Sequence, residues 1–366
     1  MNKAKAAVFI APNEPFEIRE FDVLPAPKGY GRMQLIASGV CGTDMHMWKG
    51  RLGATPNSII GHEFVGTIDD CDAEEAAKYG LKIGDNVIAD IAVPCGECIL
   101  CKEGDDANCA NLGVTNGNSI DEAPYLWGGY TEVNFTPLAN LIKIPEELDP
   151  AMVATFACPG PTAIHAFSLA KRAGIDVAKK KVAVVQGLGP VGSFAAIYLK
   201  AIGVEKVYSI VFEKNPEKLN TLKDAIGIDK IFNLAFQSAE EINAELLKEN
   251  GGLGVDLVFE ASGSPKAVPQ GMEILRNRGV YLVPGQYSAS GGIEIQPQLI
   301  TFKALQIIGS SEYSVCDVVA YTEFLCAHKE VHETIVKLGS RYPISKVNEA
   351  FADMQATKNV KTILVK

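Results

Sequence analysis

Four of the nine cysteines in the sequence lie in one short segment, and their spacing indicates a metal site. The pattern C-x2-C-x2-C-x7-C lets the thiolates converge on one ion, and four sulfurs complete a tetrahedral zinc shell. Such a shell has no vacant position for a substrate, so the predicted zinc is structural. Disulfide bonds and an iron–sulfur cluster are the alternatives, and the odd total of nine argues against a complete disulfide framework. The four residues are Cys95, Cys98, Cys101 and Cys109.

A second group of chemically active side chains lies nearer the N-terminus. Residues 39–46 read Gly-Val-Cys-Gly-Thr-Asp-Met-His, which brings a thiol, a hydroxyl, a carboxylate and an imidazole within six residues. A Gly-His-Glu segment follows at 61–63, and Cys158 precedes a Pro-Gly-Pro-Thr run. Each signal is weak alone, because a single Cys or His often belongs to the core. Their presence together with a four-cysteine site and a nucleotide loop favours a functional interpretation.

The nucleotide loop follows an apolar run at 182–186 and has the pattern Gly-x-Gly-x-x-Gly. The run is typical of a strand and the residues after it of a helix, which is the context in which this pattern binds a dinucleotide. There the first glycine permits a tight turn, the second lets the backbone approach the pyrophosphate, and the third allows close helix packing. The helix N-terminus then faces the phosphates. The residues expected at the cofactor are Gly187, Gly189, Pro190, Val191 and Gly192.

An acidic residue that binds the adenosine ribose is expected where the second strand of this unit ends. Glu213 stands 21 residues after Gly192, close to the usual interval of about 20. A carboxylate there would bond both ribose hydroxyls and repel a 2′-phosphate, which favours NAD over NADP. Two nearby lysines are compatible with NADP. Gly263 and Gly285 follow two later strands, at the sheet edge where ligands bind.

The elements that must position these residues differ between the two halves of the chain. Up to about residue 150, short β-rich stretches are broken by Gly and Pro, which indicates a mainly β arrangement similar to a barrel. From residue 180 onward, apolar strands alternate with helices, which predicts a parallel sheet covered on both faces. The expected strands are 33–37, 64–68, 86–91, 130–134, 182–186, 207–212, 256–260, 279–283 and 362–365. The expected helices are 151–156, 162–172, 192–202, 215–225, 269–275, 315–326 and 347–355.

Length and charge limit the classes of protein. A chain of 366 residues suffices for two domains, and its formal net charge of −10 argues against nucleic-acid binding. No apolar run is long enough to cross a bilayer, and the N-terminal apolar stretch is too short for a secretory signal. We therefore expect a cytoplasmic protein without a membrane or nucleic-acid partner.

Together these motifs resemble the zinc-dependent medium-chain alcohol and polyol dehydrogenases, and the Gly-Val-Cys-Gly-Thr-Asp-x-His segment resembles the sorbitol, butanediol and threonine dehydrogenase branch. The similarity covers essentially the whole chain. It implies an α/β fold, with a mainly β GroES-like catalytic domain and a doubly wound Rossmann domain. We expect the catalytic domain at 1–155, with the structural-zinc lobe at 95–109, the NAD(P)-binding domain at 156–299, and a return to the catalytic domain at 300–366. Family members are homodimers or homotetramers.

The resemblance also implies roles for the second group of side chains. Cys41, His62 and Cys158 would be ligands of a catalytic zinc, which gives two zinc ions per chain. Glu63 would be a further ligand or a carboxylate held close to the metal. Cysteine at 158 differs from the sorbitol type, which leaves the role of Glu63 open. In an ungapped match to the family the ribose-binding acid falls on Val211, so Glu213 requires a two-residue insertion.

Thr43 resembles the first hydroxyl of the family's proton relay, and His46 resembles its outer base. Asp44 would orient a zinc ligand. In the family, the turns that contain Gly263 and Gly285 pass near the nicotinamide.

The predicted function is zinc-assisted, reversible hydride transfer between a secondary alcohol or polyol and NAD(P), giving the ketone or aldehyde. A zinc-free quinone or alkene reductase of the same superfamily is one alternative. A nucleotide-binding zinc protein without catalytic activity is another. Trp48, Trp127 and Tyr130 are candidates for the substrate pocket.

Overall fold

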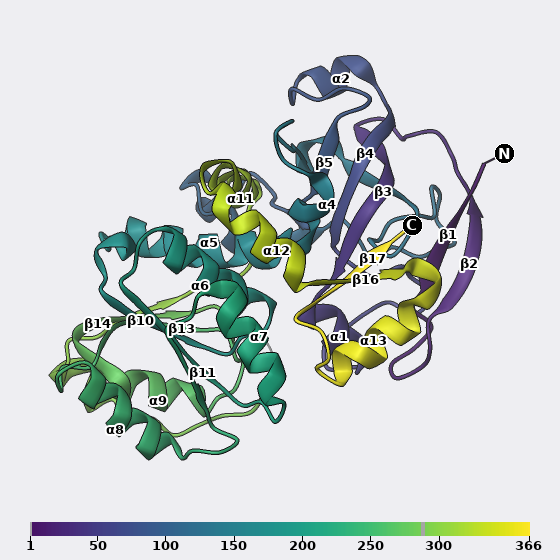
Figure 1. Cartoon of the computed structure of the whole chain (residues 1–366). Coiled ribbons are helices and arrows are strands. Elements are labelled where there is room, and N and C mark those ends of the chain that lie inside the picture. Colours follow the sequence, from purple (N-terminus) through teal and green to yellow (C-terminus); the bar gives the residue numbers. More distant parts are fainter. Residues whose placement is uncertain (1, 287–289) are drawn as a thin grey trace. The chain divides into compact units, whose positions relative to one another are not determined.

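The computed structural model describes residues 2–286 and 290–366, and the chain divides into two compact units (Figure 1). Unit 1 contains Met1–Pro161 and Glu312–Lys366, and unit 2 contains Thr162–Ser311. Unit 2 extends beyond residue 300 because it includes a helix at Gln298–Phe302 and a strand at Gln306–Gly309. This strand is the sixth of its sheet.

Unit 1 is built on a seven-stranded sheet with the order β16-β17-β3-β4-β5-β9, and β8 pairs with β3. The hydrophobic core of this unit includes Phe64, Phe135 and Leu364. The strands are β3 (Tyr30–Val40), β4 (Glu63–Cys71), β5 (Asn86–Ala89), β8 (Val133–Pro137), β9 (Leu141–Lys143), β16 (Gly339–Pro343) and β17 (Lys361–Val365). Two separate two-stranded sheets add β1 (Lys3–Val8) with β2 (Glu17–Asp22), and β6 (Ala92–Val93) with β7 (Gly113–Val114).

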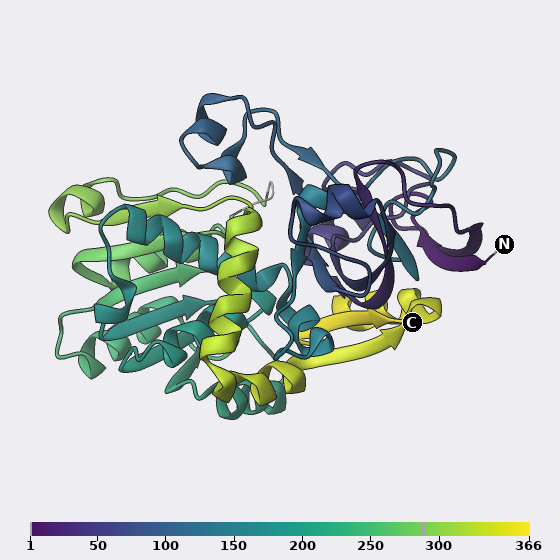
Figure 2. The ribbon, with the colours of Figure 1, turned by 90° about the horizontal axis from the view of Figure 1, so that it is seen from above.

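The C-terminal segment belongs to unit 1. Strand β17 pairs antiparallel with β3, so the yellow C-terminal strands lie beside the purple N-terminal ones in both views (Figures 1 and 2). The predicted strand at 130–134 instead forms at Val133–Pro137, because Tyr130 precedes the strand and packs in the core. The helices of unit 1 are α1 (Gly42–Trp48), α2 (Ala73–Ala77), α3 (Ile99–Lys102), α4 (Pro150–Val153), the start of α5 (Pro159–Arg172), α11 (Val315–Ala327), α12 (His332–Leu338) and α13 (Val347–Gln355).

Unit 2 is a six-stranded parallel sheet with the order β12-β11-β10-β13-β14-β15. In chain order this is 3-2-1-4-5-6, and the direction of winding reverses between β10 and β13, where nucleotides bind in such folds. Helices cover both faces (Figure 1). The strands are β10 (Val182–Gln186), β11 (Lys206–Val211), β12 (Lys230–Asn233), β13 (Val255–Glu260), β14 (Leu275–Val283) and β15 (Gln306–Gly309). The helices are α6 (Pro190–Ala201), α7 (Pro216–Ile226), α8 (Ala239–Glu249), α9 (Ala267–Ile274) and α10 (Gln298–Phe302).

This architecture confirms the predicted α/β class, with a mainly β unit and a doubly wound parallel sheet. Among the described residues, no helix is both long and apolar enough to span a bilayer.

Candidate active site

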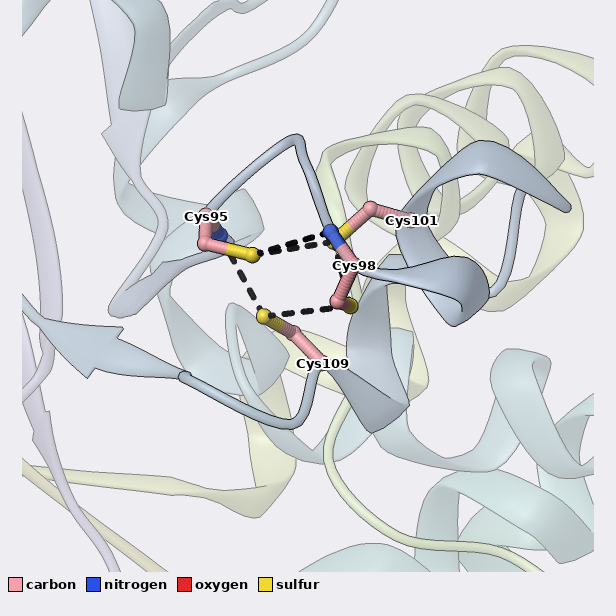
Figure 3. A group of neighbouring side chains, drawn as sticks. All are labelled: Cys95, Cys98, Cys101 and Cys109. Carbon is pink, nitrogen blue, oxygen red and sulfur yellow. Dashed lines mark hydrogen bonds between the residues drawn. The ribbon is translucent and has the colours of Figure 1, made fainter.

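The four clustered cysteines lie on the segment between β6 and β7, and their sulfur atoms surround a common centre (Figure 3). The sulfur of Cys98 is 3.5 Å from that of Cys101 and 3.9 Å from that of Cys109. The sulfurs of Cys95 and Cys101 are 4.0 Å apart. The predicted juxtaposition of these four thiols is therefore present.

These separations suit one zinc ion. With zinc–sulfur bonds of about 2.3 Å, tetrahedral geometry puts neighbouring sulfurs about 3.8 Å apart. All four thiols are free, so disulfide bonds do not account for the cluster. Backbone N–H groups, chiefly that of Cys101, lower the pKa of Cys98 to about 6, which favours the thiolate that a metal requires. The donor set fits a closed four-sulfur site.

A second group of possible metal ligands forms within unit 1 from three separate segments. Cys41 directly precedes α1, His62 and Glu63 lie where β4 begins, and Cys158 precedes α5. One donor atom from each residue lies within 4.8 Å of the other three. The sulfur of Cys158 is 3.7 Å from His62 Nε2, and tetrahedral zinc predicts about 3.6 Å for such a pair.

Asp44 connects two of these residues. Its Oδ2 accepts a hydrogen bond of 2.8 Å from the backbone N–H of Cys41, and its Oδ1 lies 3.3 Å from His62 Nδ1. With the Asp44 carboxylate beside Nδ1, the Nε2 atom of His62 faces the Cys158 sulfur. A metal-binding imidazole needs this orientation. Tyr130 donates a further hydrogen bond of 2.7 Å to Asp44 Oδ2. Asp44 and Tyr130 are both fully buried, so this network excludes water.

Glu63 pairs with a lysine from the C-terminal strand. Nζ of Lys361 lies 2.6 Å from each carboxylate oxygen of Glu63. It donates a hydrogen bond to Oε1. The same Nζ donates a 3.1 Å hydrogen bond to the carbonyl oxygen of Val40. Both charged side chains have 0% exposure, so each charge depends on the other for stabilisation.

The thiols of Cys41 and Cys158 differ in their affinity for a proton. A hydrogen bond from Cys158 lowers the pKa of Cys41 well below its usual value, against the raising effect of burial. The corresponding bond to Cys41, together with burial, raises the pKa of Cys158. Burial lowers the pKa of His62, but the carboxylate of Asp44 and the Cys41 thiolate raise it more, and the net shift is upward.

Two further predicted residues lie on α1. The hydroxyl of Thr43 is 3.7 Å from the sulfur of Cys41. His46 follows three residues later, which puts both side chains on one face of the helix. Burial and the neighbouring charges of Arg51 and Lys49 lower the pKa of His46, so its imidazole is neutral at neutral pH and able to accept a proton.

In unit 2, the glycine loop has the close approaches that its sequence predicts. A Cβ at Gly187 would lie 2.8 Å from the backbone of Ser262, and its φ of +87° favours glycine. A Cβ at Gly192 would lie 1.9 Å from the carbonyl oxygen of Gly187, so only glycine permits this helix packing. Gly189 has open space around it, immediately before Pro190 and Val191 begin α6. A phosphate group could approach this backbone.

The turns after β13 and β14 meet at the same edge of the sheet. A Cβ on Gly263 would lie 3.1 Å from the carbonyl oxygen of Gly285, so the two turns are in contact. Glu260, which is fully buried, organises the first turn. Its Oε1 accepts bonds of 2.8 and 3.0 Å from the backbone N–H groups of Ser262 and Gly263.

Glu213 lies two residues beyond the end of β11. Its Oε1 accepts backbone hydrogen bonds from Lys214 and Asn215, and its Oε2 is 3.2 Å from Nζ of Lys218. The carboxylate is therefore at the edge of the sheet where a ribose-binding acid is expected, although it also supports its own loop.

Three residues of the site were not assigned these roles from the sequence. Lys361 had no motif, since one lysine in a short apolar strand carries no signal of a distant partner. Glu260 stands three residues before Gly263 and belongs to no motif of its own. Tyr130, expected near the substrate, is buried against Asp44. Only the paired strands and turns bring each to its partner.

Comparisons with known proteins agree with this description. The family described as "Alcohol dehydrogenase GroES-like domain" matches residues 29–146, and the family described as "Zinc-binding dehydrogenase" matches residues 190–327. The chain is 31% identical over 321 residues to 5-exo-hydroxycamphor dehydrogenase of Pseudomonas putida, covering 85% of this chain and 84% of that protein. It is 29% identical to erythritol/L-threitol dehydrogenase of Mycolicibacterium smegmatis, covering 78% and 77%.

Among solved structures, an alcohol dehydrogenase from Thermotoga maritima aligns over 100% of both chains with a TM-score of 0.90 and 28% identity. The fold and the two cysteine-containing sites thus define a dehydrogenase with a dinucleotide-binding unit. The chain belongs to the zinc-dependent medium-chain alcohol and polyol dehydrogenase family. It is an NAD(P)-dependent oxidoreductase that acts on CH–OH groups, which confirms the predicted class of reaction.

Proposed function

We propose that the protein reversibly oxidises a secondary alcohol or polyol to the ketone or aldehyde with NAD, and that Cys41, His62 and Cys158 hold the catalytic zinc. The observation that carries this proposal is the convergence of their donor atoms, with that of Glu63, within 4.8 Å. Unlike the four-sulfur cluster, three ligands leave a position for a substrate. We assign the second, structural zinc to the four-cysteine cluster.

Zinc at such a site supplies a Lewis acid that lowers the pKa of an alcohol hydroxyl, and the nicotinamide accepts the hydride. The protein must then remove a proton. The 3.7 Å distance between the Cys41 sulfur and the Thr43 hydroxyl supports Thr43 as the first acceptor. His46, with its lowered pKa, is suited to pass that proton to water. Asp44 orients His62 during this transfer.

We propose that unit 2 binds the cofactor through Gly187, Gly189, Pro190, Val191 and Gly192. The open space around Gly189 at the start of α6 supports a pyrophosphate there. Glu213 would bond the adenosine ribose, which favours NAD over NADP, and the ion pair with Lys218 would then be rearranged. Gly263 and Gly285 are assigned to the nicotinamide side of the site.

The proposed substrate class is supported by the similar proteins, whose names include 5-exo-hydroxycamphor dehydrogenase and erythritol/L-threitol dehydrogenase. We further propose a homodimer or homotetramer and a cytoplasmic location, where a reducing environment keeps metal-binding thiols available.

Replacing one ligand tests the catalytic assignment. Cys41→Ser should lower kcat by at least about a thousandfold and reduce the zinc content by one ion per chain, because only the catalytic site loses a sulfur. Binding of NADH, followed by fluorescence, should persist. The control is Cys316→Ser, which changes an exposed thiol. A Cys41→Ser protein with full activity and unchanged zinc content would refute the mechanism.

A substrate panel tests the chemistry itself. Initial rates of NADH and NADPH formation should be compared with secondary alcohols, vicinal diols, sugar alcohols and hydroxy acids. We expect secondary alcohols or polyols to give the highest kcat/KM, and NAD to be preferred. Turnover confined to primary alcohols or NADP would contradict the assignment.

A further inference from the structure

The side chain of Lys361 places its ammonium group in the protein interior, without access to solvent. Its side chain has 0% exposure, and it begins β17, about 300 residues along the chain from its ion-pair partner Glu63. Buried lysines are rare, because removing an ammonium from water is costly unless a partner compensates its charge. A single complementary carboxylate therefore explains why the C-terminal strand carries a lysine here.

The strand register places this ion pair in the space beside Gly39, which has no side chain. Gly39 of β3 pairs directly with Glu63 of β4 and with Ile363 of β17. A Cβ at Gly39 would lie 1.9 Å from Glu63 Oε2 and 2.9 Å from Lys361 Cε. The side chains of Glu63 and Lys361 thus occupy the volume that any larger residue at position 39 would fill.

Glu63 faces two competing partners. One of its oxygens lies within 4.8 Å of the donor atoms of Cys41, His62 and Cys158, which is close enough to join them around a metal. Both of its oxygens lie 2.6 Å from Nζ of Lys361. A carboxylate that bound the metal as a fourth protein ligand would complete a tetrahedral shell and remove the position needed by the alcohol.

We infer that Lys361 is a positioning residue that holds Glu63 in a buried ion pair and so keeps it from becoming the fourth protein ligand of the catalytic zinc. This inference rests on the proposed function of Cys41, His62 and Cys158. The charges agree with it, since zinc and Lys361 together carry three positive charges against two thiolates and one carboxylate. In a zinc-bound site His62 is neutral, so without the ammonium the metal is the cation that remains beside Glu63.

The test uses Co²⁺ in place of zinc, because the visible absorption of Co²⁺ depends on the number and type of its ligands. Subtracting the spectrum of the Cys41→Ser protein removes the contribution of the four-cysteine site. In Lys361→Met, the difference spectrum should change to that of a site with an added oxygen ligand, and kcat/KM should fall by about 10–100-fold. The spectrum should return in Lys361→Met/Glu63→Gln, which has no carboxylate to bind the metal and no unpaired buried charge.

The matched control is Lys358→Met, which breaks an exposed lysine–aspartate pair at the same end of the chain, 2.6 Å from Lys358 Nζ to Asp353 Oδ1. Its spectrum and kcat/KM should equal those of the wild type. The inference is overturned if Lys361→Met binds Co²⁺ with an unchanged spectrum, or if Glu63→Gln alone removes an oxygen ligand. If Lys361→Met does not fold, the Co²⁺ spectrum of Lys361→Met/Glu63→Gln is measured instead. A spectrum of this double variant that differs from that of the wild type contradicts the inference. Failure of the proposed site itself looks different, because the Cys41→Ser subtraction would then leave no signal.

Discussion

At the scale of single residues, the candidate catalytic group is held by buried side chains that contact Cys41 and His62. Asp44 fixes both the backbone of Cys41 and the ring of His62, and Tyr130 completes the hydrogen bonding of that carboxylate. Buried polar networks of this kind specify one geometry, because any missing partner leaves an unsatisfied group. The Tyr130 hydroxyl should therefore influence metal binding without contacting the metal.

Tyr130→Phe tests this influence. It removes the 2.7 Å hydrogen bond to Asp44 while preserving the ring in the core. A hydrogen bond to a charged group contributes about 1.5–3 kcal/mol, so the free energy of unfolding should fall by about that amount. Zinc affinity, measured by competition with a chelator, should fall as well. Tyr342→Phe is the control, since it removes a comparable 2.9 Å bond to Asp353 and should leave zinc affinity unchanged.

Asp90 gives a pH-dependent prediction. It has 1% exposure, and burial raises its pKa from 3.8 to about 8, against the lowering effect of the Ala92 N–H. Between these values the folded protein holds a proton that the unfolded chain has lost. The resulting stability is fully present below about pH 4 and is lost as the pH rises through 8, with a slope of at most about 1.4 kcal/mol per pH unit.

Asp90→Asn should remove this dependence, because an amide does not titrate. The difference in unfolding free energy between Asp90→Asn and the wild type should grow in favour of the variant as the pH rises. Urea unfolding at several pH values between about 5 and 9 measures it. A constant difference across that range would show that Asp90 is ionised in the folded protein.

At the scale of elements, the turn before α6 has two glycines with different spatial requirements. A Cβ at Gly192 meets backbone at 1.9 Å, whereas a Cβ at Gly189 meets nothing within 4 Å. Gly192→Ala should therefore destabilise the protein by about 1–3 kcal/mol through overpacking. Gly189→Ala should leave the thermal midpoint nearly unchanged but weaken NADH binding by about tenfold, because the added methyl occupies space assigned to the pyrophosphate.

The two substitutions serve as controls for each other when unfolding and NADH fluorescence titrations are both recorded. If Gly189→Ala bound NADH as tightly as the wild type, the loop would not contact the cofactor as proposed. Equal loss of stability in both variants would contradict the packing seen at Gly192.

The sequence predicted some elements better than others for physical reasons. The apolar run of β10 and the amphipathic pattern of α13 were predicted with their observed bounds. Helix α8 was missed although Ser238 and Glu241 form a capping box before it, since its many charged residues weaken an apolar pattern. Strands β12 and β15 were missed because each has four residues, and β15 is largely exposed.

The site shows the same division. The spacing of the four clustered cysteines and of the loop glycines indicated one metal site and the nucleotide loop, because those patterns are local in the chain. The ligand set Cys41, His62 and Cys158 lies in three separate segments and followed only from the resemblance to the family. Lys361 could not be found in this way, since its partner is 298 residues distant and only the pairing of β17 with β3 brings them together. Contacts that depend on sheet register are not encoded in any short motif.

At the scale of the whole molecule, the last strand completes a sheet begun by residues near the N-terminus. Strand β17 lies between β16 and β3, and it supplies Lys361 to the candidate catalytic group. Unit 1 therefore cannot form its sheet until the chain that follows unit 2 has been made. The molecule should accordingly be intolerant of truncation at its C-terminus.

A chain ended after Val360 tests this dependence. It lacks β17, including Ile363 and Leu364, which have 0% exposure and each contribute about 1.5–3 kcal/mol by burial. It also leaves Glu63 as a buried carboxylate without its ammonium partner, which costs several kcal/mol more. These losses are comparable to the total stability of a typical domain, about 5–15 kcal/mol, so the truncated protein should be recovered in the insoluble fraction. A chain that lacks only the exposed Lys366 should remain soluble, and soluble, zinc-loaded protein from the shorter chain would contradict the role given to this strand.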